Sequence, residues 1–202
     1  MSSDDHLKDL IQRIELFLSK HHTISIATSA EGELWSASVF YVSDEKLNIY
    51  FISFEESKHI QGLLKNKRVS ATINQDVSDW MQIKGLQLQG VAYKVPEQHR
   101  KDILNAYRKK FDSINRLLEL PETDDEKKIA KQFNSISLFS FDPDWIRLLD
   151  NSLSFGSKEE IELKNQTWLM QKYTNSILSR LLLNILVVSQ GECHYQQSIS
   201  RQ

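Results

Sequence analysis

Between residues 23 and 53 the chain carries three short segments whose composition favours β-strands, and no other part of it limits the fold as strongly. The segments are rich in β-branched and aromatic residues, and their sequences are TISIATS, ELWSASVFYVS and LNIYFIS. They are separated by the polar stretches AEGE and SDEK, which are typical of hairpin turns. Because a hairpin joins antiparallel neighbours, the sequence predicts three consecutive antiparallel strands here.

The rest of the chain up to residue 164 adds helices and further strands. Helical periodicity is found over residues 4–20, after residue 57, and from residue 96 to about residue 133. Gly85 and Gly90 lie inside one long predicted strand and indicate a bend, a bulge or the close approach of another segment. This order of elements predicts an α+β domain, mainly β, that is built on a small antiparallel barrel. The further strands are predicted in RVSATIN, WMQIKGLQLQGVAYKV, SISLFSF, WIRLLDN and EEIEL.

The length of 202 residues suits one domain with an appendage, and we place the boundary after residue 164. Residues 1–164 hold all the predicted strands, whereas residues 165–202 form a C-terminal extension of different character. The apolar run of this extension, residues 177–188, is too short to span a bilayer of roughly 30 Å. We therefore expect either a helix that packs on the domain or on a second copy, or a disordered tail.

Composition narrows the classes of function. The net charge of −2 gives no reason to expect a nucleic-acid or membrane partner. A single cysteine, Cys193, excludes a disulfide scaffold and a cysteine-based zinc site, and the six histidines are scattered, so no metal site is predicted. The N-terminus lacks the apolar stretch of a signal peptide, and the simplest compartment is therefore the cytoplasm.

The candidate site lies in the stretch SFEESKHIQGLLKN, because the usual catalytic motifs are missing from the sequence. A predicted strand ends at Ser53, and a helix begins near Ser57, Lys58 and His59. The N-terminus of a helix offers unpaired backbone N–H groups and partial positive charge, which suit an anion. In the simpler interpretation Ser57 only caps the helix, and Lys58 and His59 are only solvated. The residues alone leave both interpretations open.

The neighbouring predicted strand, WSASVFYV, alternates small and large side chains. The small side chains of Ser36, Ala37 and Ser38 would let a flat ligand lie against the backbone. The same alternation is also how a tapering barrel fills its space. Lys84 and Gln87, on the long predicted strand, could reach the same cleft.

The order and spacing of these motifs resemble the FMN-binding split-barrel superfamily, whose best-known member is pyridoxamine phosphate oxidase. The resemblance covers about residues 5–163, and it includes the hydroxyl at Ser53, the pattern S-K-H-x-x-x-L-x-x-N and the sequence KGLQLQG. The sequence is most similar to the uncharacterised YhbP-like branch, through GELWSASVFYV, KGLQLQG and DNSLSFG. The resemblance implies a six-stranded antiparallel split β-barrel with flanking helices, followed by an atypical C-terminal tail.

The resemblance also implies a cofactor and its site. In the superfamily a Ser-Arg-Lys run opens the helix and holds the FMN phosphate, and Ser57, Lys58 and His59 occupy these three places. Ser53 matches a hydroxyl that also faces the phosphate. The implied assembly is a homodimer with FMN in a cleft between subunits, where backbone groups of residues 38–41 border the flavin ring. The implied cofactor-binding residues are Ser38, Val39, Phe40, Tyr41, Ser53, Ser57, Lys58, His59, Lys84 and Gln87.

The chain departs from the superfamily pattern at three places. Ser36 stands near the place of an arginine on the second strand, and Lys84 and Gly85 stand in place of an Arg-Gln pair on the long strand. The segment DNSLSFG lacks the arginines that bind a substrate phosphate in the superfamily. We therefore expect weaker FMN binding, no action on pyridoxamine phosphate, and no assignable catalytic residue. The leading expectation is an FMN-binding protein that works as a flavin-dependent oxidoreductase on an unknown substrate. The alternatives are a haem-binding or haem-degrading split barrel with a histidine as axial ligand, or a non-catalytic dimeric module.

Overall fold

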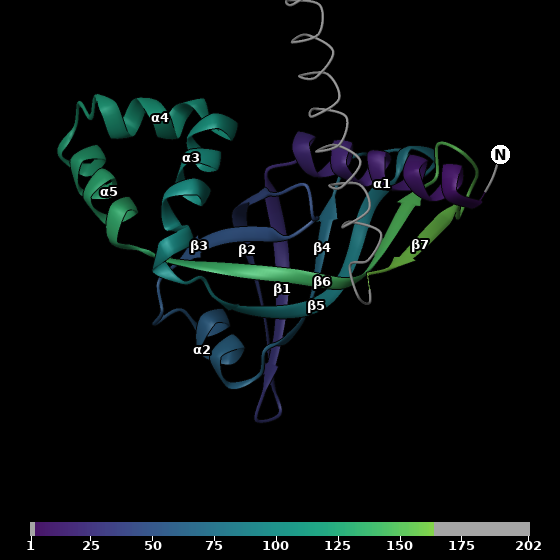
Figure 1. Ribbon diagram of the computed structural model, residues 1–202, viewed down its shortest axis with the longest axis horizontal. Coiled ribbons are helices and arrows are strands. Elements are labelled where there is room, and N and C mark those ends of the chain that lie inside the picture. The colour runs from purple at the N-terminus through teal and green to yellow at the C-terminus, as the bar shows by residue number, and fades with distance from the viewer. Residues whose placement is uncertain (1–2, 164–202) are drawn as a thin grey trace, which may run out of the picture. The chain divides into compact units, whose positions relative to one another are not determined.

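The computed structural model describes residues 3–163, and a closed antiparallel barrel lies at its centre (Figure 1). Its strands are β1 (Thr23–Ala30), β2 (Glu33–Ser43), β3 (Ile49–Ser53), β4 (Arg68–Asn74), β5 (Lys84–Lys94), β6 (Ser137–Asp150) and β7 (Lys158–Glu162). They follow the order β3-β2-β1-β4-β5-β6-β7, and the additional pairing of β3 with β6 closes the first six into a barrel. The prediction of a six-stranded antiparallel split barrel is confirmed, and β7 extends the sheet beyond β6.

Two tight hairpins set the register of the first three strands, as the sequence predicts. Between β1 and β2, Glu31 and Gly32 have positive φ angles of 55° and 82°, the conformation that hairpin turns favour. Between β2 and β3, the Asp44 carboxylate accepts the backbone N–H groups of Lys46 and Asn48, each at 2.9 Å. An aspartate that bonds the backbone ahead of it stabilises such a turn.

Alternating side chains fill the barrel. On β5, Leu86 and Leu88 are buried, whereas Gln87 and Gln89, which alternate with them, are exposed. This period of two is what a strand with one face on a core requires. The same alternation buries Ile24 and Ile26 of β1, Ile49 and Phe51 of β3, and Val69, Ala71 and Ile73 of β4.

Two helices cover opposite sides of the barrel, α1 (Ser3–Lys20) and α2 (Lys58–Lys65) (Figure 1). The apolar stripe predicted for α1 is confirmed by burial of Leu10, Ile11, Ile14, Phe17 and Leu18. The shorter α2 buries Ile60 and Leu63 and lies so close to β1 that a Cβ at position 62 would approach the Thr28 hydroxyl to 2.9 Å. The middle of α2 therefore packs closely against the barrel.

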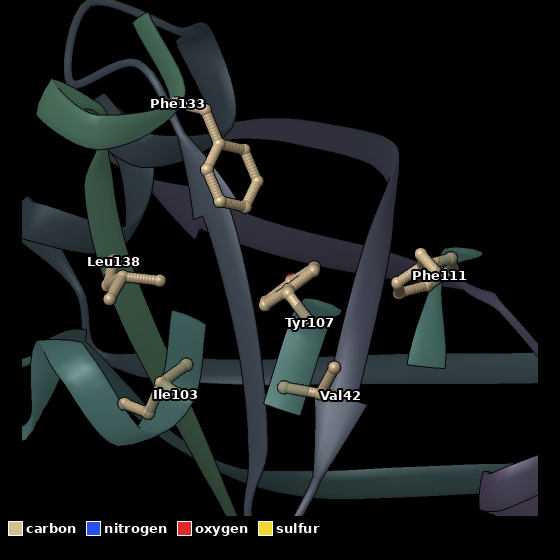
Figure 2. Packing of buried hydrophobic residues seen from close by; sticks show 6 residues of the cluster. All are labelled: Val42, Ile103, Tyr107, Phe111, Phe133 and Leu138. Carbon is tan, nitrogen blue, oxygen red and sulfur yellow. The ribbon is translucent and has the colours of Figure 1, made fainter. Parts of the chain in front are cut away.

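Three further helices pack outside β2, β3 and β6: α3 (Arg100–Lys110), α4 (Asp112–Glu119) and α5 (Asp124–Ser135). The helical prediction for this region is confirmed, and its apolar face meets the strands in a second cluster (Figure 2). Thr123 and Glu126 start α5 with a capping box. The cluster consists of Val42, Ile103, Tyr107, Phe111, Phe133 and Leu138.

Two predicted strand boundaries are wrong. The long strand does not start at Trp80, because residues Trp80–Gln82 form a short 3₁₀ helix, η1, which Asp79 caps by accepting the N–H of Met81. The segments SISLFSF and WIRLLDN are parts of one continuous strand, β6. Pairing of β5 with β6 shifts register at Gln89 and Gly90, so the irregularity predicted from Gly90 is confirmed.

The prediction for residues 165–202 falls outside the described part of the chain. Within residues 3–163, no helix is both long and apolar enough to cross a membrane.

Lys110, near the end of α3, gives a prediction about pH and stability. Its ammonium lies 3.8 Å from the centroid of the Tyr41 ring and donates to the Leu18 carbonyl, and burial lowers its pKa to about 8. Between pH 8 and the ordinary lysine pKa, the unfolded chain binds more protons than the folded chain, so the contribution of Lys110 to stability rises with pH. We expect the free energy of unfolding of the wild type, relative to Lys110→Met, to rise by about 1 kcal/mol between roughly pH 8 and 9.5, after allowance for solvent screening.

Urea denaturation of both proteins at several pH values measures this difference. Tyrosine ionisation is common to both and cancels in the comparison. A difference that stays constant across this window would show that Lys110 titrates normally in the folded protein.

Candidate functional site

The candidate site forms where β3 ends and α2 begins. Ser57 occupies the N-cap position with extended backbone (φ −62°, ψ 139°), and its carbonyl accepts the first helical bond from Gln61. Among the described residues, however, its hydroxyl makes no capping bond to the helix. Ser57 therefore stands at the N-cap but leaves the first N–H groups of α2 without a side-chain cap, which favours the anion-binding interpretation over the simple cap.

Three polar side chains meet beside this helix start. The Ser53 hydroxyl, at the end of β3, lies 2.9 Å from Nε2 of His59 and 3.4 Å from the Ser57 hydroxyl. Ser53 is buried and His59 is half-buried, and burial lowers the pKa of the imidazole. His59 is therefore predominantly neutral at pH 7 without a ligand.

Lys58 is directed to the other side of the helix start. Its Nζ lies 4.3 Å from the centroid of the Trp35 ring and 3.9 Å from the Glu33 carboxylate. The side chains of Lys58 and Glu33 are 56% and 78% exposed, so their ion pair contributes little. The ammonium can therefore move to a stronger anion at modest cost.

The split of the barrel opens next to these groups. β2 pairs with β3 over Tyr41–Ser43, with Tyr41 opposite Phe51, and the described ladder goes no further. Continuing the register would place Val39 opposite Ser53, so the two strands separate where the polar group lies. At the start of the split, the Tyr107 hydroxyl bridges the strands by donating to the carbonyls of Phe40 (2.8 Å) and Tyr50 (3.1 Å).

Only part of the backbone predicted to border a flavin ring faces this split. The Phe40 carbonyl points away from β1, and groups two residues apart on a strand point the same way, so Ser38 also presents its backbone to the split. The backbones of Val39 and Tyr41 face β1 instead, where the Tyr41 N–H donates to the His22 carbonyl. The Tyr41 side chain is buried and its hydroxyl donates to the Leu18 carbonyl, so this side chain is part of the core.

A second group of predicted residues lies on the outer face of the sheet. Cross-strand pairing aligns Ser38, Ser25, Thr72, Gln87 and Arg147 in one row. The row crosses an open hollow of about 440 Å³, in which Arg147 donates to the Gln87 amide oxygen at 3.0 Å. The Ser38 side chain and Gln87 therefore lie on the same face of the sheet, three strands apart, and on a different surface from Ser53, Ser57 and His59.

Lys84 does not join either group within one chain. Its Nζ lies 2.5 Å from the buried carboxylate of Asp150. Burial favours the neutral acid, but the hydrogen bonds from Lys84 and Ser152 outweigh it and lower the pKa of Asp150. The pairing register puts Lys84 six residues along β5 from the row that contains Trp35, which is about 20 Å. Lys84 therefore cannot reach the start of α2 within its own chain.

Two contributors were not predicted from the sequence. Trp35 is 44% exposed and lies beside Lys58. Tyr107 is buried, and its hydroxyl bonds both strands at the start of the split. Trp35 directly precedes the small residues at positions 36–38, and this position could have identified it from the sequence. Tyr107 bonds to residues far away in the sequence, so no sequence signal identifies its role. Within residues 3–163, no cluster of three metal-ligating side chains is found.

Comparison with known proteins adds relatives at the sequence level. No family model matches the chain. It is 28% identical to a UPF0306 protein of Klebsiella pneumoniae over 151 residues, which are 74% of this chain and 91% of that protein. It is 26% identical over the same length, with the same coverage, to the UPF0306 protein YhbP of Escherichia coli O157:H7. This chain is a relative of YhbP.

Solved structures similar to this chain share its fold. Campylobacter jejuni ChuZ matches with a TM-score of 0.61 at 18% identity, over 78% of this chain and 61% of that one. A heme binding protein from Mycobacterium smegmatis matches with a TM-score of 0.56 at 15% identity, over 75% and 57%. A putative pyridoxamine 5'-phosphate oxidase from Listeria innocua matches with a TM-score of 0.52 at 18% identity, over 70% and 98%. At these identities the likeness establishes the split barrel and nothing finer.

Proposed function

We propose that this protein binds FMN in the split between β2 and β3, beside the start of α2, and works as a flavin-dependent oxidoreductase. The observation that carries the proposal is the uncapped N-terminus of α2, where Ser53, Ser57 and His59 meet at the point where β2 and β3 separate. Two hydroxyls, an imidazole, a mobile ammonium and free backbone N–H groups form a donor set that fits a phosphate. The adjacent split gives a flat ring a place beside the phosphate.

The residues of the site have distinct roles in this proposal. Ser53, Ser57 and His59 hold the phosphate on one side, and Lys58 leaves Trp35 to approach it from the other. The backbone groups of Ser38 face the ring edge. Bound FMN would supply electron or hydride transfer through its isoalloxazine ring, and the protein would orient the ring and shield it from water. No residue is assigned as an acid or a base.

A homodimer is part of the proposal. The outer sheet face is hollowed and carries small residues, and large apolar side chains around the barrel are exposed, including Leu34 (78%), Phe40 (56%) and Trp80 (73%). A two-fold partner would cover this surface, and a stable interface of this kind buries more than roughly 1,200 Å². Because the strands of a two-fold partner can run in the opposite direction, Lys84 and Gln87 are proposed to approach the flavin from the second copy.

Placing a charge in the hollow tests the dimer. Ala27 is exposed and lines the hollow, and Ala27→Arg should separate the subunits by adding bulk and like charges across the two-fold axis. We expect the wild type to sediment as a dimer at micromolar concentration and Ala27→Arg as a monomer. The matched control, Ser113→Arg on exposed α4, should remain dimeric. A monomeric wild type would remove the shared-site model.

Haem is the second candidate ligand. The observation that favours it is the likeness of the fold to the heme binding protein from Mycobacterium smegmatis, together with a half-buried imidazole, His59, at the split. Against it, Nε2 of His59 is already bonded to Ser53. A non-catalytic dimer whose flavin pocket is lost is the third possibility, motivated by Ser36 and Gly85.

One experiment separates these functions. The absorbance spectrum of untreated purified protein shows flavin bands if FMN is bound and an intense Soret band if haem is bound. Fluorescence titration of the ligand-free protein with FMN, and with riboflavin as a control that lacks the phosphate, then measures the phosphate contribution. Absence of binding to both flavins would remove the proposed function.

A further inference from the structure

His59 differs from the other two residues of the Ser57–Lys58–His59 run in one chemical respect. Its side chain is the only one of the three whose ordinary pKa lies between pH 5 and 8. In the structure its imidazole is half-buried and bonded to the neutral hydroxyl of Ser53, and burial disfavours the charged form. The ring is therefore predominantly neutral at pH 7, and within residues 3–163 it lacks an anion that would stabilise the imidazolium.

The charged groups around His59 do not supply that anion. On the same helix, Lys58 is a cation and is directed toward Glu33 of β2. In the preceding turn, Glu55 is bonded to Lys94 of β5 at 2.5 Å and to Ser137 of β6 at 2.6 Å. The other acid of the turn, Glu56, has an exposed side chain. Relative to the described part of the chain, a phosphate at the start of α2 would be the first negative charge placed directly against the ring.

We propose that the site binds a phosphate group together with a proton, which His59 takes up as the ligand arrives. This inference rests on the proposed flavin site, and it adds that the affinity for FMN strengthens as the pH falls. A permanent cation at position 59 would bind the phosphate equally at any physiological pH. A histidine instead links occupancy of the site to the proton concentration.

The sign of the linkage follows from the two states of the imidazole. An anion beside the ring raises the imidazole pKa above its value in the free protein, so binding takes up a proton. The stabilising contact is fully present below the free-state pKa and is lost as the pH rises through the bound-state pKa. The phosphate loses charge below its own second pKa of about 6, and this weakens binding at the acidic end independently of His59.

The test compares the FMN affinity of three proteins from about pH 5.5 to 8.5. In the wild type, the dissociation constant should rise up to about tenfold per pH unit between the free-state and bound-state pKa values of His59. His59→Lys should show only the titration of the phosphate and be nearly flat above about pH 6.5. His59→Gln should bind more weakly and be equally flat. A wild-type profile parallel to that of His59→Lys overturns the inference but leaves the flavin site intact.

A second measurement does not depend on FMN. NMR titration of the His59 imidazole in the wild-type protein, with its resonance assigned by loss in His59→Gln, gives its pKa without and with sulfate, which keeps its charge in this range. Sulfate should raise that pKa, and an unmoved value overturns the proton uptake. If FMN binds at no pH but sulfate raises the pKa, the proposed flavin function fails while the proton-linked anion site stands.

Discussion

Replacing Gly90 by alanine should lower the free energy of unfolding by about 3 kcal/mol, the upper range for an atom forced into a filled space. Gly90 lies on β5 where pairing with β6 changes register, and a Cβ there would collide with the carbonyl oxygen of Asp142 and with Cα of Pro143. Both obstacles are backbone atoms of the neighbouring strand, so no side chain can rotate away. The two strands must move apart at the irregularity, and chemical denaturation measures the loss.

Gly85→Ala is the matched control, because it adds the same methyl group to the same strand. The nearest atom to a Cβ at position 85 is Oδ1 of Asn74, at 2.8 Å, on a side chain that can move, although the Ile73 carbonyl is also close at 3.0 Å. The loss of stability should therefore be clearly smaller than for Gly90→Ala. Equal losses of stability in the two variants would mean that β5 and its neighbouring strand move apart as easily at Gly90 as at Gly85.

The barrel was predictable because its signals are local. Alternation in KGLQLQG buries Leu86 and Leu88, and the polar separators between the first three strands become the turns at Gly32 and Asp44. The errors arose where local signals conflict with pairing. Trp80 has strand propensity but follows Asp79, whose carboxylate caps a short helix, and β6 is continuous because β5 accompanies it past Pro143.

The site was predictable to the extent that its residues are neighbours in sequence. Ser53, Ser57 and His59 fall within one strand–turn–helix unit, and the fold brings them together. Adjacent residues of a helix point in different directions, so Lys58 lies on a different side of α2 from His59. The sequence motif lists the two residues side by side and does not show this difference. The Lys84–Asp150 pair was missed because it joins two strands far apart in the sequence. Lys84 was therefore assigned to a cleft that its side chain does not reach within its own chain.

Lys58→Ala should weaken FMN binding by about 1.5–3 kcal/mol, which is roughly ten- to a hundredfold in the dissociation constant. The ammonium now lies over Trp35, 3.9 Å from an exposed carboxylate, so little is lost when it leaves them for a phosphate. With His59 neutral near pH 7, Lys58 is the permanent cation of the Ser57–Lys58–His59 run. Fluorescence titration with FMN measures the change, and riboflavin should show almost none.

Lys65→Ala provides the control for charge at a distance. Lys65 lies at the other end of α2, is similarly exposed and is paired with Glu31 at 2.7 Å, so its removal changes the net charge equally without touching the phosphate site. Its FMN affinity should stay within about twofold of the wild type at moderate salt, because exposed charges this far apart are screened. If both variants lose the same affinity, the effect is long-range attraction rather than contact. If Lys58→Ala binds FMN as tightly as the wild type, the phosphate does not sit at the start of α2.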